Sequence, residues 1–177
     1  MREDLEASLQ ERVDHVSSLL AEIAQGEPDS WHLAIREAFR AEPTSNLLLG
    51  FMSDQVTYPV VTMQPLAMRV MQAEIDQRVP VGALAATPRV EIDQSKLIDE
   101  FHATIDEQKL PRGYPKEVLT DFVLRTASEI VSVKTSMLVY LMLHTGTIHP
   151  VSQVRSYVLD LIMRELDRRI PKPAEGQ

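Results

Sequence analysis

The stretch YPKEVLTDFVLRTASEIVSVKTSMLVYLMLH, residues 114–144, decides the fold class of this chain. It contains no glycine, and its only proline, Pro115, stands at the start, where a helix tolerates proline. Apolar residues recur mostly at intervals of three and four through its first two-thirds, which is typical of an amphipathic helix. From Met137 to Leu143 every residue is apolar or tyrosine, which predicts burial on all sides. The stretch therefore predicts one long central helix, roughly 45 Å long at ~1.5 Å per residue.

The rest of the chain is divided into further helices by proline, glycine and capping residues. Helical apolar spacing is found in six other segments, 3–25, 30–41, 46–57, 63–78, 94–109 and 150–170. Residues 79–92 combine two prolines, one glycine and small side chains, which favours a loop. We expect an all-α fold of about seven helices around the helix 114–144, with no internal repeat.

One domain spanning residues 1–177 is the expectation for a chain of this length. Within it, residues 1–26 form an N-terminal helix that can protrude from the body, and residues 171–177 form a frayed tail. Hydrophobic residues make up 44% of the chain and charged residues 25%, which is enough apolar content to build a core.

Composition excludes several classes of protein. The chain has no cysteine, which excludes disulfides, thiolate nucleophiles and cysteine-ligated zinc. The apolar run from Met137 to Leu143 is far shorter than the ~20 residues that span a bilayer. Residues 1–20 are acidic and amphipathic and lack the pattern of a signal peptide. We therefore expect a cytoplasmic protein with no membrane partner.

No motif of catalysis is present. The five histidines form no HExxH pair, and neither GxxxxGK[ST] nor GxGxxG occurs. We predict no catalytic residue, no cofactor and no metal ligand. An enzyme whose site forms only in three dimensions stays an alternative, because sequence motifs do not test for it.

A heptad pattern marks the N-terminal segment. Apolar residues step by four and three along it, at Leu9, Val13, Val16, Leu20 and Ile23. This run is shorter than the three or four heptads that a free coiled coil requires. The seam therefore has two interpretations, packing into the chain's own core or self-association into a homodimer.

Charge is distributed unevenly along the chain. Residues 1–108 carry 8 Lys and Arg against 19 Asp and Glu, a net charge of −11, whereas residues 109–177 carry 10 against 7, a net charge of +3. Residues 137–169 have the outline of a helix-turn-helix, in which the second helix reads DNA. Candidate residues for binding nucleic acid or a partner lie on that helix, at Gln153, Arg155, Arg164, Arg168 and Arg169. Arginines in a last helical turn are also favoured by the helix dipole alone.

The sequence favours a non-catalytic helical module that binds another protein, such as an adaptor, a regulator or an assembly subunit. The absence of catalytic motifs, the heptad seam, the methionine face of the helix 63–78 (Met63, Met68 and Met71) and the charge asymmetry are the basis of this prediction. The second hypothesis is a transcription regulator that binds DNA through residues 137–169, and the third is an enzyme.

Overall fold

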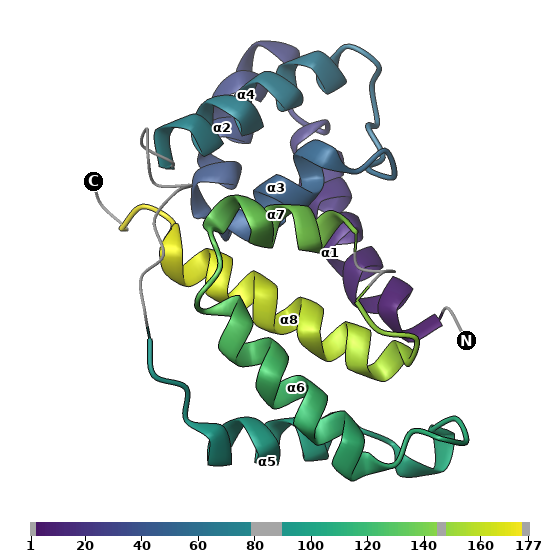
Figure 1. The fold of residues 1–177 in the computed structure, drawn as a ribbon. Coiled ribbons are helices and arrows are strands. Elements are labelled where there is room, and N and C mark those ends of the chain that lie inside the picture. The colour runs from purple at the N-terminus through teal and green to yellow at the C-terminus, as the bar shows by residue number, and fades with distance from the viewer. Residues whose placement is uncertain (1–2, 79–89, 145–147, 175–177) are drawn as a thin grey trace. The chain divides into compact units, whose positions relative to one another are not determined.

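The structure is a computed structural model that describes residues 3–78, 90–144 and 148–174 (Figure 1). All regular elements in these ranges are helices, which confirms the all-α prediction, and eight of them are α-helices. In the described ranges, no helix is long and apolar enough to cross a membrane. Most of the predicted loop 79–92 lies outside the described residues.

The residues group into two compact units, and each has its own helices. The N-terminal unit comprises Ala7–Gly82 with Ile170–Gln177, and the C-terminal unit comprises Ala83–Arg169 with Met1–Glu6. The prediction that both belong to a single domain of residues 1–177 stays a prediction.

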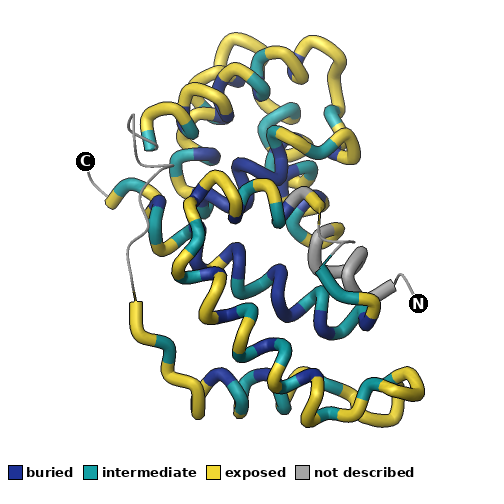
Figure 2. Tube along the Cα trace, viewed as in Figure 1, coloured by how far each residue is buried: buried dark blue, intermediate teal, exposed yellow. Residues whose placement is uncertain are grey.

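The N-terminal unit is built on four α-helices. They are α1 (Glu3–Ile23), which belongs to this unit from Ala7 onward, α2 (Trp31–Ala41), α3 (Thr44–Met52) and α4 (Met63–Arg78), with a 3-10 turn η1 (Pro28–Ser30) before α2. Trp31, Ile35 and Phe39 are spaced four residues apart and are buried in α2, as its helical apolar spacing predicts. Figure 2 shows buried segments alternating with exposed segments along the helices. The indole Nε1 of Trp31 donates to the carbonyl oxygen of Gly26 at 3.1 Å, which satisfies its polar atom inside the core.

The C-terminal unit also contains four α-helices. They are α5 (Gln94–Thr104), α6 (Lys116–Ile130), α7 (Thr135–Leu143) and α8 (Ser152–Arg169), with a 3-10 turn η3 (Glu107–Lys109) after α5. The side chain of Asp93 caps α5 by accepting from the backbone N–H of Lys96 at 3.1 Å. Helix α5 packs on α6 and α8 through Leu97 and Phe101, which are buried.

The predicted long central helix is wrong, because residues 114–144 form two helices. Helix α6 ends at Ile130 and α7 begins at Thr135. Between them Lys134 is extended, with φ −63° and ψ 147°, and the hydroxyl of Ser132 donates back to the carbonyl oxygen of Glu129 at 2.9 Å. Neither glycine nor proline marks this break, so sequence punctuation did not indicate it.

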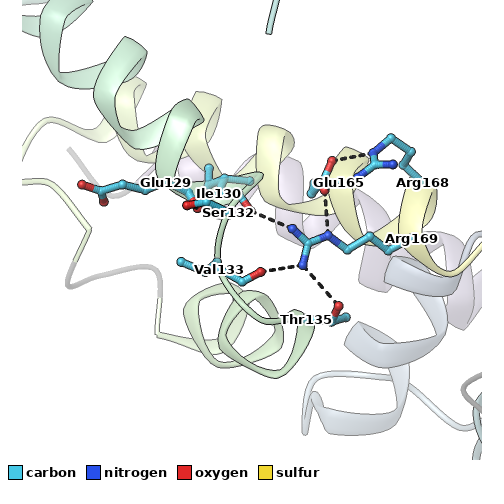
Figure 3. A network of polar contacts seen from close by, with 8 residues as sticks. All are labelled: Glu129, Ile130, Ser132, Val133, Thr135, Glu165, Arg168 and Arg169. Carbon is cyan, nitrogen blue, oxygen red and sulfur yellow. Dashed lines mark hydrogen bonds and ion pairs between the residues drawn. The ribbon is translucent and has the colours of Figure 1, made fainter. Parts of the chain in front are cut away.

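A buried arginine at the end of α8 stabilises the interruption between α6 and α7. The guanidinium of Arg169 donates to the carbonyl oxygens of Ile130 (3.0 Å) and Val133 (2.7 Å) and to the hydroxyl of Thr135 (3.2 Å) (Figure 3). Its Nε donates to Glu165 at 2.7 Å, and the Arg169 side chain is only 3% exposed. The arginine thus satisfies carbonyl groups that an interrupted helix would leave without donors.

The N-terminal unit contains the same arrangement around Arg78. This guanidinium is 1% exposed and donates through Nε to Glu74 at 2.9 Å. Its other nitrogens donate to backbone carbonyls around the end of α2 and to a hydroxyl at the start of α3: Phe39, Arg40, Glu42 and Thr44. Each unit therefore joins the end of one helix to the start of the next through a buried Arg–Glu pair.

These two networks reveal an internal repeat, and the prediction of none is wrong. Thr44 and Thr135, Glu74 and Glu165, and Arg78 and Arg169 are all 91 positions apart. The segment EIDQRVP (74–80) aligns with ELDRRIP (165–171) at that spacing, and TSNLL (44–48) aligns with TSMLV (135–139). Helices α3 and α7 also begin and end at matching positions. Few residues are identical outside these segments, which is why composition and motif searches miss the repeat.

Helix α7 is not buried on all sides, contrary to the expectation for Met137–Leu143. Leu138 and Met142 are buried, whereas Met137 is 47% exposed and Tyr140 is 55% exposed. The apolar run is therefore a helix with one buried face and one exposed apolar face.

We predict that the two arginines are required for stability. Arg78→Ala should lower the free energy of unfolding by about 3–5 kcal/mol, because it leaves the buried Glu74 carboxylate without its partner. Arg169→Ala should lower it by about 1–3 kcal/mol, because Glu165 keeps its pairing with Arg168 while the carbonyl groups of Ile130 and Val133 lose their donor. Denaturant unfolding followed by circular dichroism measures this loss.

Arg125→Ala is the matched control. Arg125 is exposed on α6, and its Nε donates only to the carbonyl of Asp121 at 3.4 Å. This change should cost about 0.5 kcal/mol or less. If Arg78→Ala and Arg169→Ala each lower the free energy of unfolding by less than about 1 kcal/mol, the two arginines do not stabilise the helix ends as assigned.

The Glu165 carboxylate should make stability depend on acid pH. Burial raises its pKa, and hydrogen bonds from Arg168 and Arg169 lower it; together they hold the pKa below the ordinary value of 4.5. Because the folded pKa is depressed, this contribution is complete above about pH 4.5 and is lost as the pH falls through the folded pKa. The stability difference between the native chain and Glu165→Gln should therefore shrink below that pH. A difference that stays constant from neutral to acid pH would exclude this linkage.

Candidate binding groove

An open groove lies between α2 and α4 of the N-terminal unit. Its volume is about 540 Å³. Leu66, Val70 and Ala73 of α4 supply the apolar part of its lining, and His32 and Arg36 of α2 lie on the other side. This volume lies within the range typical of ligand-binding pockets, roughly 300–1,000 Å³.

Two arginines give the groove a cationic rim. Arg36 and Arg69 are both exposed, and the Nε of Arg69 donates to the carbonyl of Pro65 at 3.4 Å. Neither forms an ion pair with any carboxylate that the structure describes. Of the groove's carboxylates, Glu74 is paired with Arg78, and Asp76 lies near the end of α4. The Arg36 and Arg69 charges are therefore available to a ligand.

The residues predicted to bind DNA or a partner are engaged within the C-terminal unit. At the start of α8, Gln153 accepts from the backbone N–H of Asp106 at 2.6 Å and donates to its carbonyl at 3.2 Å. Arg155 donates to the carbonyl oxygens of His149 and Pro150, both at 2.8 Å. A base-reading role would require Gln153 and Arg155 to release these contacts.

The arginines near the end of α8 are also paired. Arg164 forms ion pairs with Asp160 at 2.6 Å and Glu100 at 3.0 Å. Arg168 pairs with Glu165 at 2.6 Å, and Arg169 is the buried arginine that joins the end of α6 to the start of α7. The five candidates are thus distributed along α8 and do not gather into one site; the DNA-binding prediction stays a prediction.

The heptad seam supplies the core of the N-terminal unit. Val13, Val16 and Leu20 are 0–3% exposed and belong to one buried cluster with residues of α2, α3 and α4. Ile23 is partly buried against this cluster, and the side chain of Leu9 lies outside the described part. The structure supports the first interpretation of the seam, packing into the chain's own core, and a homodimer stays a prediction.

Sequence reasoning missed the groove, although α4 carries a signal for it. Met63, Ala67 and Met71 form the stripe of α4 that enters the core. Leu66 and Ala73 lie outside that stripe, on the face that lines the groove. A second apolar stripe on an amphipathic helix indicates a second contact surface.

His149 occupies a separate aromatic cluster in the C-terminal unit. Its ring lies 4.6 Å from the ring of Phe122 and 5.5 Å from that of Tyr114. Its Nδ1 accepts from the backbone N–H of Val151 at 3.1 Å. Burial, and then the positive charge of Arg155, lower the pKa of His149 below its ordinary value of 6.5.

Comparison with other proteins adds no indication of function. No protein-family model, curated protein or solved structure matches the chain. A proposal of function therefore depends on the geometry of this molecule.

We predict that the pKa of His149 responds to Arg155. In a proton NMR titration, His149 should titrate below 6.5 in the native chain, and Arg155→Met should raise this pKa only partway because burial persists. Arg36→Met, in the other unit, is the control and should leave it unchanged. An identical His149 pKa in native chain and Arg155→Met would rule out the electrostatic effect.

Proposed function

We propose that this protein is a non-catalytic helical module, an adaptor, regulator or assembly subunit, that binds another protein. The observation that carries the proposal is the open groove between α2 and α4. Ala73 of its apolar lining is exposed and Leu66 is half-buried, and a partner's apolar side chains would remove the exposed part of this surface from water. Grooves between helices commonly bind a helix of a partner through such apolar contacts.

The charge of the groove supports a protein partner over nucleic acid. Arg36 and Arg69, which form no ion pair with a described carboxylate, can provide steering and specificity at the rim of a protein interface. A duplex requires a broad basic surface, and the candidate arginines Arg164, Arg168 and Arg169 are neutralised by carboxylates of their own unit. A cytoplasmic location and the DNA-binding and enzyme alternatives stay predictions.

The proposal is tested by capture and reconstitution. The full chain is immobilised, retained proteins are identified from the native host, and each is purified and measured against the chain by calorimetry. We expect at least one direct protein partner and weak binding to duplex DNA at about 150 mM salt, where surface electrostatics are screened.

Ala73→Arg is the variant that connects partner binding to the groove. Ala73 is exposed and lines the groove, so the larger side chain should block binding without unfolding the unit. Ala103→Arg, an exposed alanine on α5, is the matched control and should bind normally. Tight duplex binding with no direct protein partner would overturn the proposal in favour of a DNA-binding protein.

A further inference from the structure

The repeat provides two equivalent grooves, one open and one covered. A shift of 91 positions places Leu66 on Tyr157 and Ala73 on Arg164. Leu66 and Ala73 line the open groove between α2 and α4. Tyr157 and Arg164 lie on α8, where α5 packs. Helix α5 therefore occupies the corresponding groove between α6 and α8.

Helix α5 contacts this groove through two apolar residues, Leu97 and Phe101, and through the carboxylate of Glu100. The rings of Phe101 and Tyr157 lie 5.2 Å apart, and the hydroxyl of Tyr157 donates to the carbonyl oxygen of Leu97 at 3.2 Å. Glu100 accepts from Arg164 at 3.0 Å. The C-terminal unit thus shows how a short amphipathic helix, with apolar residues four apart, sits on this pair of helices.

Helix α1 does not take this place in the N-terminal unit. It packs instead beside α3, where Arg12 donates to the side chain of Asn46 at 2.7 Å. A Cβ added at Gly50 of α3 would lie 3.4 Å from Val16, which shows how closely the two helices approach. The groove between α2 and α4 is consequently left without a covering helix of its own unit among the described residues.

The two grooves differ in charge. Val123 and Ala127 of α6 are buried, whereas the corresponding residues of α2 are His32 and Arg36, both exposed. On the other wall, Arg69 of α4 stands where α8 has an aspartate. An occupant of the open groove therefore meets two arginines at positions where α5 meets none.

We propose that the open groove binds an acidic amphipathic helix of a partner protein, seated as α5 is seated in the C-terminal unit. This inference rests on the proposed protein-binding function. Apolar residues four positions apart, like Leu97 and Phe101, contact Leu66 and Val70, and carboxylates on the flanks pair with Arg36 and Arg69. Carboxylate–guanidinium pairs at the rim supply specificity, and the apolar contacts supply most of the affinity.

The test uses peptides based on α5, residues 93–105, added to the full chain. A lactam bridge between a lysine introduced by Ser95→Lys and the side chain of Asp99, two positions that are exposed in α5, keeps each peptide helical. The acidic peptide carries Lys96→Glu and Ala103→Glu, and the basic peptide carries Glu100→Lys and Ala103→Lys. Fluorescence anisotropy measures binding to the native chain, to the double variant Arg36→Glu/Arg69→Glu, and to Arg125→Glu as control.

We expect the acidic peptide to bind the native chain and Arg125→Glu equally, and to bind the double variant about tenfold more weakly at low salt. The basic peptide should prefer the double variant, which is a rescue by charge exchange. A peptide could also displace α5 from the C-terminal unit, and such binding would not depend on Arg36 or Arg69. The double variant therefore distinguishes binding in the open groove from displacement of α5. Circular dichroism confirms that the double variant is folded.

Three results with the peptides, and one with a purified partner, would overturn the inference. The first is that the acidic peptide binds the native chain and the double variant equally. The second is that neither peptide binds. The third is that Leu97→Asp in the acidic peptide leaves its binding unchanged. A purified partner that binds the double variant normally would show that the protein-binding function stands while this groove is not its seat.

Discussion

The structure depends on a buried guanidinium that holds two helix ends together, and the chain uses it twice. A helix that stops inside a protein leaves carbonyl groups without donors, and burying them unsatisfied is costly. Arg78 and Arg169 provide a planar group of N–H donors whose geometry reaches carbonyls, a threonine hydroxyl and a glutamate at once. A lysine offers a single point of charge and could not replace this geometry. The arginine therefore fixes where one helix ends, where the next begins and how the last helix lies against both.

Both units contain this buried Arg–Glu pair, but a different helix packs against the other helices in each unit. In the N-terminal unit α1 packs beside α3, and in the C-terminal unit α5 packs on α6 and α8. The difference leaves a groove in the N-terminal unit that is filled in the C-terminal unit, and it leaves Met137 and Tyr140 of α7 exposed at positions where α3 has the buried Asn46 and Leu49. A repeated helical scaffold that carries the covering helix in only one unit therefore offers a groove for the proposed binding in the other.

The function we propose follows from that difference and from charge. An apolar groove alone would accept many ligands, whereas in the proposed function Arg36 and Arg69 favour ligands that carry carboxylates. The arginines of α8 show the contrasting case, because carboxylates of their own unit already surround them. Whether an arginine is paired within its own unit or left available for the proposed recognition thus depends on its neighbours.

The sequence by itself determined the fold class, the buried face of α2 and the end of that helix before Pro43, because apolar periodicity and proline act locally. It did not indicate the break after Ile130, where Lys134 adopts nearly the same backbone conformation as Pro43 without being forced to do so. That break depends on Arg169, 39 residues away from Ile130, and no local pattern reports such a contact. The repeat and the groove are likewise tertiary features, since they arise from which helices meet after folding. Local chemistry sets where a helix can form, and long-range hydrogen bonds and packing decide where it stops and what it leaves exposed.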